Sequence, residues 1–521
     1  MKYIERLLVS FAIASLVLLA ATVSADEYDG TVRVGYLYLD REGDYSVNQS
    51  TFNLYQGLEI SLERFSYLFD NGVSLSANIS NATLENRNLS VGATKAGRWG
   101  VGFTHNSYRR QYDFDGETRT KRHRSGGQIW WRARPWLKVF GGVGLTKKTG
   151  DMLALFEPQQ AAAGDGVDYA HWFYNAGFTV RRARSTAQVE YRGSTFTDNE
   201  DLLNDRNTQR FRASASVPIP DYENLILNGG YQYYRVALDS RPDTLRAHTL
   251  WGGARLSFSK GYSVRYSFIF DRARRTGDLS ETDNITHAVY AGKNWVRRGG
   301  VTVGYRYRMR DDVSDELTGN AYFVTAYWRP INDLKLRAGY GSDDLNVDEG
   351  QTLTGNTELR RGWFSVRYQT GYGWARFSLQ SRQTDNDEIG SSVEYMRLAT
   401  DLSVEVPEYA TLVGSYTYGT GEYTNSSGEF EYNEHIIKGD VTSREYKNTT
   451  LGFGGTYLRS RRDLDIEGFS VRFSGQYKFE KGWGLRATYS SHNFDNFNDP
   501  SPVYTEYYTD NVVQVSLSYD L

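Results

Sequence analysis

Apolar and polar residues alternate with a period of two along almost the whole chain. Clear examples are the runs Tyr262–Phe270, Phe469–Tyr477 and Val513–Leu521. A period of two places successive side chains on opposite faces of a β-strand. Each run covers about ten residues, which is the length that a tilted strand needs to cross a bilayer. The pattern therefore predicts many membrane-spanning strands, each with one apolar face and one polar face.

The first residues differ from the rest of the chain. Lys2 and Arg6 precede the apolar run Leu7–Ala20, and the small residues of Val23–Ala25 follow it. This is the pattern of a secretory signal peptide, and the run is too short for an anchor helix. We therefore expect a signal peptide over residues 1–25 and one barrel over 26–521. No later segment reaches 18 consecutive apolar residues, so insertion into a membrane must use strands.

Composition agrees with strands rather than helices. The chain has 40 Tyr, 25 Phe and 51 Gly, but only 9 Pro and 4 Met. Aromatic residues are enriched in strands. A mean hydropathy of −0.58 shows that the chain has too few apolar residues to form a large apolar core. The absence of cysteine excludes disulfides, thiolate metal sites and covalent haem attachment by this chain. A formal net charge of −3 argues against a nucleic-acid partner.

The connections between strands alternate between tight and long. Tight turns such as Asp70–Gly72 recur at intervals of roughly 33–40 residues, as expected for a hairpin plus its loop. One interval is double that, and we fill it with a weak strand near Phe430–Ile437 and a weak turn near Asp440–Ser443. The count is then about 26 strands, with 24 as the alternative. Tyrosines near the strand ends, such as Tyr231 and Tyr305, indicate an aromatic girdle.

Together these features predict an all-β fold, a single large antiparallel transmembrane β-barrel in a Gram-negative type of outer membrane. Its short turns face the periplasm and its longer loops face outward. A soluble β-sandwich or β-helix is the alternative, but it would need neither the signal peptide nor the girdle. The first strand begins near Gly30, which leaves no room for a plug domain of the siderophore-transporter kind. Because a barrel this wide would leave a water channel, we expect loops, a partner protein or a ligand chain to fill it.

Arginines recur at the polar positions of the strands, which face the lumen. They are Arg33, Arg192, Arg212, Arg255, Arg265, Arg306, Arg337, Arg367, Arg376, Arg472 and Arg486. The same strands carry few inward acids, among them Glu59 and Glu190, whereas acids gather in the expected loops at Asn199–Asp201 and Asp343–Asp344. A net positive lumen would attract an anionic guest, such as an acidic polysaccharide, small anions or an acidic cytochrome surface. The alternative is that the arginines form ladders with acids and Tyr that stiffen the wall.

Nothing in the sequence marks a catalytic site. None of the seven His residues stands in the HExxH spacing of a zinc hydrolase. Gly144–Thr149 lacks the spacing of a phosphate-binding loop and falls on a predicted strand. The acidic loop segments lack a defined calcium-binding pattern. We therefore predict no enzyme activity and no catalytic, cofactor-binding or metal-binding residues.

With about 26 strands, a start without a plug and a basic lumen, the chain resembles the MtrB/PioB type of outer-membrane porin over its whole mature length. The resemblance implies a sheath around a periplasmic multihaem c-type cytochrome, with haem present only through that partner. Electrons would pass through this haem wire toward an outer-surface cytochrome or a mineral. The alternative function is a channel or exporter for anionic solutes or polysaccharide. In either case, lipopolysaccharide and outer-membrane lipid would surround the barrel.

Overall fold

The computed structural model describes residues 28–43, 54–111, 119–151, 166–199, 205–239, 244–276, 281–296, 298–311, 316–348, 356–386, 390–426, 428–497 and 507–521. The expected signal peptide lies outside these residues, as do Glu200 and Asp201 of the expected acidic loops. No helix within the described ranges is long and apolar enough to cross a membrane.

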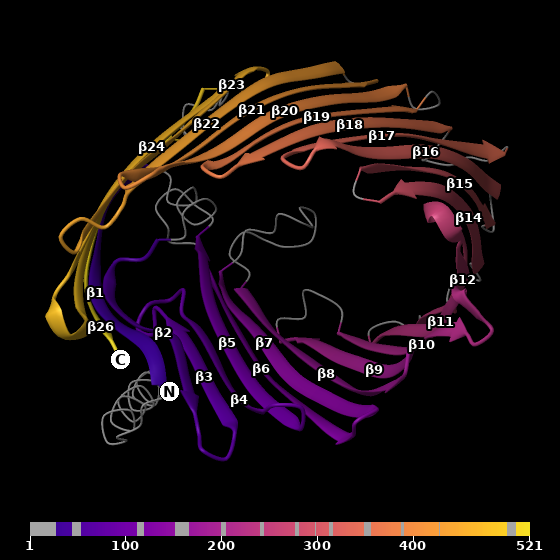
Figure 1. The fold of residues 1–521 in the computed structure, drawn as a ribbon, viewed down its shortest axis with the longest axis horizontal. Helices are drawn as coiled ribbons and strands as arrows, with labels where there is room; N and C mark the ends of the chain where they lie inside the picture. The colour runs from indigo at the N-terminus through magenta and orange to yellow at the C-terminus, as the bar shows by residue number, and fades with distance from the viewer. Residues whose placement is uncertain are drawn as a thin grey trace.

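The described residues form one antiparallel sheet of 26 strands that closes on itself (Figure 1). The first half comprises β1 Tyr28–Gly43, β2 Gly57–Leu68, β3 Val73–Ser80, β4 Asn88–Lys95, β5 Trp99–Gln111, β6 Arg119–Arg134, β7 Leu137–Asp151, β8 Gly166–Arg182, β9 Ser185–Asp198, β10 Arg206–Ile219, β11 Tyr222–Leu238, β12 Thr244–Ser257 and β13 Tyr262–Arg275. The second half comprises β14 Glu281–Trp295, β15 Gly299–Asp311, β16 Glu316–Ile331, β17 Leu334–Asp348, β18 Thr357–Thr370, β19 Gly373–Asn386, β20 Ser391–Val406, β21 Ala410–Asn425, β22 Gly428–Ser443, β23 Thr449–Arg462, β24 Ile466–Lys478, β25 Trp483–Asn496 and β26 Tyr507–Asp520. Two single-turn 3₁₀ helices, η2 at Ser259–Gly261 and η3 at Glu480–Gly482, occupy tight turns.

Each strand pairs with its neighbours in sequence, and β1 pairs with β26 to close the ring. The closing register runs from Thr31 opposite Asp520 to Gly43 opposite Tyr508. The predicted fold class and the count of 26 strands are confirmed. Both described ends of the chain lie at the end of the barrel that carries the tight turns, and Figure 1 shows them side by side.

The alternation predicted from sequence separates the two faces of the wall. The outward face carries large exposed apolar side chains, of which Ile129 and Leu451 are each 59% exposed. Only lipid can cover such a continuous apolar belt, so the protein is an integral outer-membrane barrel. Tyr231 and Tyr305 lie on this outward face, as the girdle interpretation predicted. Because a shift of one residue would turn every apolar side chain into the lumen, the belt fixes the register.

Several predicted boundaries were wrong. The weak turn expected at Asp440–Ser443 is the end of β22, and the chain turns instead at residues 444–448. There Lys447 and Asn448 both have positive φ, which lets a longer connection reverse the strand. Strand β17 runs on to Asp348, so Asp343 and Asp344 belong to the wall and not to a loop. Polar strand ends that project beyond a membrane read as loops in sequence, which explains these errors.

The strands of one hairpin, β3 and β4, are too short to reach the long-loop end of the wall. Strands β3 and β4 have 8 residues each, whereas β2 and β5 on either side are longer. The connection 81–87 fills the gap between them. The Ala82 amide donates to the Ile60 carbonyl on β2 at 2.8 Å, and the Ser107 amide on β5 donates to the Arg87 carbonyl at 2.9 Å. Glu85 forms ion pairs with Arg109 on β5, at 2.8 Å, and with Lys121 on β6.

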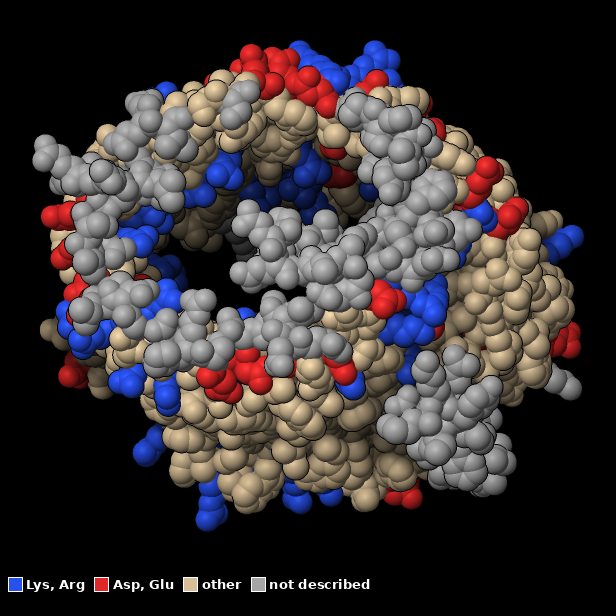
Figure 2. All heavy atoms as spheres, turned by 180° about the vertical axis from the view of Figure 1, so that it is seen from behind, with Lys and Arg blue, Asp and Glu red and all other residues tan. Residues whose placement is uncertain are grey.

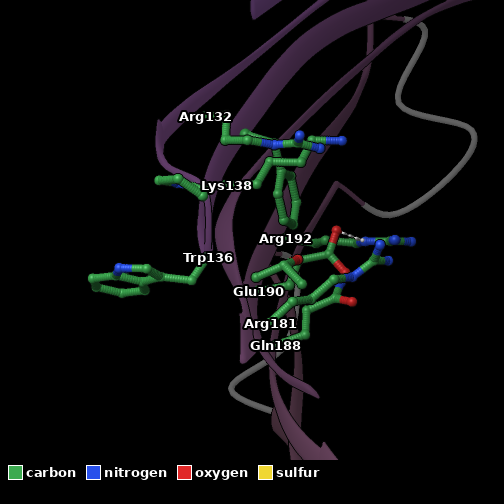
Figure 3. Close-up of a pocket in the computed structure, with 10 residues that line it drawn as sticks. Arg132, Trp136, Lys138, Arg181, Gln188, Glu190 and Arg192 are labelled. Atoms are coloured by element: carbon green, nitrogen blue, oxygen red, sulfur yellow. Dashed lines mark hydrogen bonds and ion pairs between the residues drawn. The ribbon is translucent and has the colours of Figure 1, made fainter. Parts of the chain in front are cut away.

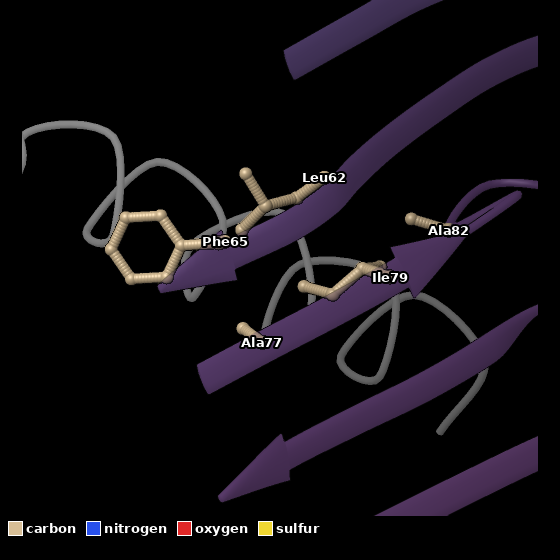
Figure 4. Close-up of a cluster of buried hydrophobic side chains, with 5 residues drawn as sticks. All are labelled: Leu62, Phe65, Ala77, Ile79 and Ala82. Atoms are coloured by element: carbon tan, nitrogen blue, oxygen red, sulfur yellow. The ribbon is translucent and has the colours of Figure 1, made fainter. Parts of the chain in front are cut away.

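A small apolar cluster accompanies this irregularity (Figure 4). Its members come from β2, β3 and the connection that follows: Leu62, Phe65, Ala77, Ile79 and Ala82. Strand β2 bulges at Arg64, whose φ is 53°, and the bulge brings Phe65 into the cluster. Phe65 also lies against β1, where a Cβ added at Gly30 would stand 2.9 Å from the Phe65 Cα. Glycine at position 30 therefore permits the close approach.

Candidate functional site: the lumen wall

The predicted arginines share one face of the wall. In each strand, the residues next to the arginine are exposed apolar residues of the outward face or are paired with such residues on a neighbouring strand. Because successive residues of a strand point to opposite faces, each arginine points to the lumen. This holds for Arg33, Arg192, Arg212, Arg255, Arg265, Arg306, Arg337, Arg367, Arg376, Arg472 and Arg486. Figure 2 shows Lys and Arg gathered on the inner wall that is visible through the opening.

Some of these arginines form ladders with acids. The pairs are Arg33 with Glu63 at 2.7 Å, Arg192 with Glu190 at 2.8 Å, Arg306 with Asp343 at 2.5 Å and Arg472 with Asp440 at 2.7 Å. Arg308, which the sequence interpretation did not select, shares Asp343 at 3.0 Å. Asp343 was expected in a loop, so the longer β17 places an acid inside the barrel. The wall-stiffening interpretation therefore describes this part of the set.

Other arginines lie over aromatic rings. The contacts are Arg212 over Trp251 at 5.0 Å, Arg265 over Tyr290 at 5.4 Å and Arg367 over Trp374 at 5.5 Å from the guanidinium carbon to the ring centroid. A cation over an aromatic face gains electrostatic stabilisation and is held in one orientation without losing its charge. These arginines are positioned by the wall, but their positive charge remains available to the lumen.

Several lumen cations stand directly opposite one another on neighbouring strands. Lys335 is opposite Arg367, which is in turn opposite Arg376, so three cations form a row across β17, β18 and β19. Arg255 and Arg265 form another such pair across β12 and β13. Among the described residues, no carboxylate forms an ion pair with any of these five. Like charges in direct cross-strand register are destabilising. Asp401 on β20 is directly opposite Arg376, so one acid faces the row of three cations, and the row keeps a net positive charge.

The sequence interpretation missed some members of this set. Lys335 was overlooked because only arginines were selected. Further cross-strand cation pairs join Arg192 to Arg210, and Arg361 to Arg382. The same alternation would have placed all of them in the lumen. Their pairing could not be read from the sequence, because it depends on a register that only the structure gives.

One recess in the lumen wall collects cations near the tight-turn end (Figure 3). It has a volume of about 460 Å³, and β6 to β9 contribute its lining. The charged side chains around it are Arg132, Lys138, Arg181, Glu190 and Arg192. Trp136, from the tight turn between β6 and β7, points away from this group in Figure 3.

The single carboxylate of this recess is already engaged. Glu190 is 7% exposed, and it accepts hydrogen bonds from Arg192 Nε at 2.8 Å and from Asn175 Nδ2 at 3.3 Å. The remaining charges of the recess, on Arg132, Lys138 and Arg181, have no ion-pair partner among the described residues. The recess can therefore receive an anionic group.

A second recess of about 550 Å³ lies between β16, β17 and β18. Its charged lining consists of Arg329, Lys335 and Arg337, and no acid contributes to it. Strand β17 enters the recess at its first residues, next to the tight turn that follows β16. Both recesses therefore lie toward the tight-turn end of the barrel, and both are basic.

The described residues offer one group of carboxylates close enough to share a cation. Oxygens of Glu422, Glu429 and Glu431 lie within 4.8 Å of one another on β21 and β22. Glu431 already forms an ion pair with Arg462, and the other two side chains are exposed. The group has the chemistry of a solvated acidic rim, and it includes neither His nor Cys.

Comparisons with known proteins show the fold. No protein family matches the sequence, and no curated protein matches it. Among solved structures, the chain is similar to a mutant of the ferric enterobactin receptor PfeA from Pseudomonas aeruginosa. The TM-score is 0.53 at 9% identity, covering 95% of this chain and 81% of the receptor. It is also similar to the siderophore receptor PirA from Acinetobacter baumannii, with a TM-score of 0.52 at 8% identity, covering 96% and 81%. At this identity the likeness establishes the large β-barrel fold and nothing about its cargo.

Proposed function

We propose that this barrel is a conduit across the outer membrane whose basic lumen holds an anionic occupant, and that this occupant is a multihaem c-type cytochrome. The observation that carries the proposal is the set of unpaired cations in direct cross-strand register, above all Lys335, Arg367 and Arg376. Such rows weaken an empty wall. They become favourable when an acidic partner supplies the opposite charge.

The size of the barrel favours a protein as the occupant. Barrels of 16 to 18 strands already leave an aqueous channel, and this one has 26. All described residues belong to the strands or to their connections, so the described part of the chain supplies no separate domain for the lumen. An acidic cytochrome surface with its haem propionates has the charge to match the wall. The barrel would insulate the haem chain and perform no redox chemistry itself.

The basic recesses near the tight-turn end fit the same proposal. A cytochrome that entered from the periplasm would meet Arg132, Lys138 and Arg181 on one part of the wall and Arg329 and Lys335 on another. Cations at the entrance would speed the encounter with an acidic partner and fix its orientation. An outer-surface cytochrome would then receive the electrons at the long-loop end.

The test is a gentle detergent purification of the native complex, followed by a haem-stained gel and a visible spectrum. We expect a c-type cytochrome to co-purify and to show a Soret band. Replacing Arg337, Arg367 and Arg376 with Glu should release it while the barrel keeps its resistance to unfolding by SDS. A haem-free barrel purified from cells that make multihaem cytochromes would contradict the proposal.

A channel for anionic solutes or polysaccharide is the second candidate. The recess around Arg181 favours it, because a pocket of this volume suits a carboxylate, sulfate or phosphate group better than a protein surface. The similar structures named above are receptors, one of them for ferric enterobactin, which accords with a role in solute transport. Anion-selective conductance by a haem-free barrel in planar bilayers would favour this candidate over the cytochrome sheath.

A further inference from the structure

Three arginines form a row on the outer face of the barrel. Arg235 on β11 is directly opposite Arg246 on β12, and Arg246 is directly opposite Arg274 on β13. Paired positions on adjacent strands point to the same face and lie about 5 Å apart. The row is therefore a compact patch of three positive charges. We call Arg235, Arg246 and Arg274 the outer arginine row.

The neighbouring positions show that this row faces outward. Four residues along the strands lies the row of Tyr231, Leu250 and Phe270, which belongs to the apolar belt, and Leu250 is 46% exposed. The row of Tyr233, His248 and Arg272 lies between the two on the same face. Side chains two residues apart on a strand share a face. The outer arginine row thus continues the lipid-facing surface toward the loops after β11 and β13.

The acids nearest in register are already engaged elsewhere. On β14, Glu281 is directly opposite Arg274 and Asp283 is directly opposite Arg272. Both acids form their ion pairs with Arg272, at 3.2 and 2.6 Å. Within the described chain, no carboxylate forms an ion pair with a member of the outer arginine row. In addition, Nε of Arg235 is buried and has no hydrogen-bond partner. A buried donor without a partner is costly, and so are like charges in register.

The row lies at the long-loop end of the barrel, just beyond the apolar belt. In an outer-membrane barrel this end faces outward, so the row lies at the headgroup level of the outer leaflet. Planar guanidinium groups match the oxygens of a phosphate through paired hydrogen bonds, and several of them can share one phosphate.

We propose that the outer arginine row binds the phosphate groups of a phosphorylated glycolipid of the outer leaflet. The apolar belt, which lies beyond the intervening row of Tyr233, His248 and Arg272, distinguishes a lipid from free phosphate. Acyl chains that pack along Leu250 and Phe270 would hold the attached phosphates at the row, whereas a free phosphate would gain nothing from the belt. This site is on the opposite face of the wall from the lumen, so it can be tested independently of the proposed conduit.

The experiment compares the wild-type barrel with the variant Arg235→Gln/Arg246→Gln/Arg274→Gln. The matched control is Arg337→Gln/Arg367→Gln/Arg376→Gln, which loses the same charge from the lumen. Purified barrels are titrated with bisphosphorylated lipid A, with its dephosphorylated form and with inorganic phosphate. Binding is followed by native mass spectrometry and by the heating midpoint of the folded band on SDS gels.

We expect the wild type and the lumen control to bind the bisphosphorylated lipid at least about tenfold more tightly than the outer-row variant does. The dephosphorylated lipid and inorganic phosphate should bind weakly to all three. Equal binding of the phosphorylated lipid by the outer-row variant would overturn the proposal, as would equal binding of the dephosphorylated lipid by the wild type. If the triple variant fails to fold, Arg246→Gln alone provides the same comparison, because it removes the centre of the row.

Discussion

Removing the unpaired lumen arginines should weaken the preference of the empty barrel for anions. The variant Arg337→Gln/Arg367→Gln/Arg376→Gln deletes three positive charges from adjacent strands, β17 to β19, where Arg367 and Arg376 are in direct register. None of the three forms an ion pair among the described residues, so the change breaks no ion pair there. The nearest carboxylate in register is Asp401, directly opposite Arg376 on β20. Any effect on permeation then reports the lumen potential and not a rearranged wall.

The size of the effect follows from Coulomb's law. An anion about 8 Å from each guanidinium gains about 0.5 kcal/mol per charge in water, before screening. At 0.1 M salt the screening length of about 10 Å leaves roughly half of this, or about 0.7 kcal/mol for the three charges together. The row should thus enrich a monovalent anion about threefold, and the variant should lose about that factor in relative anion permeability. At 1 M salt, where the screening length is about 3 Å, the difference should nearly vanish.

The assay is the reversal potential of purified barrels in planar bilayers under a salt gradient, repeated at both salt levels. The control is Arg472→Gln/Asp440→Asn, which removes an ion pair of 2.7 Å and leaves the net charge unchanged. This control should keep the wild-type selectivity. A variant with unchanged selectivity at low salt, or with a loss that persists at high salt, would refute the electrostatic reasoning.

Three further changes test the wall itself. Gly304→Val should lower the heating midpoint of the folded band by the equivalent of about 1–3 kcal/mol, because a Cβ there would overlap the Phe323 ring and force it to move. Glu85→Gln should destabilise the barrel at neutral pH. Burial raises the pKa of Glu85, but the hydrogen bond from Lys121 and nearby cations outweigh it and hold this pKa below 4.5. The ion pairs thus stabilise the fold above pH 4.5, and wild type and variant should converge in heating midpoint as the pH falls through the depressed value. Arg306→Glu should lower the heating midpoint, because it places a second carboxylate beside Asp343, the partner of Arg306. Arg367→Glu should instead raise it slightly, because the new carboxylate would stand between Lys335 and Arg376.

Each of these changes has its own control. Gly439→Val adds the same side chain where no heavy atom lies within 4 Å of the new Cβ, so it should be tolerated. A stability gap between Glu85→Gln and wild type that remained constant down to pH 3 would contradict the ion-pair account. Equal heating midpoints for Arg306→Glu and Arg367→Glu would show that the pairing of Arg306 contributes nothing to the wall.

The strands and their faces could be predicted from sequence because both depend on local spacing. A period of two decides which side of the wall a residue occupies. By this rule Arg33 and Arg486 share a face, although they lie far apart in the sequence. The weak strand expected near Phe430–Ile437 is confirmed within β22. The positions of the strands and the faces of their residues can be predicted without knowing which residues pair between neighbouring strands.

What could not be predicted depends on register or on irregular backbone. The opposition of Arg367 and Arg376 appears only when the register of β18 and β19 is known. The bulge at Arg64 shifts the pairing of β2 with β3, and no sequence pattern marks it. The ion pair of Asp343 was missed for a similar reason, because a polar strand end resembles a loop in sequence. The sequence therefore predicts which charged residues line the lumen, but only the structure shows which of these charges are paired.

The junction between β1 and β26 has a consequence for how the protein forms. Thr31 Oγ1 donates to Asp520 across 489 residues of chain, at 2.7 Å. Closing a loop of that length in an unstructured chain would cost about 5 kcal/mol of entropy. Hairpins added one after another bring the two edges together in advance, so the seam can form only after the other strands are in place. A chain that lost its last strand would keep two open edges, and open edges recruit other chains. Assembly thus depends on the strand that closes the ring, which makes β26 a checkpoint for the whole barrel.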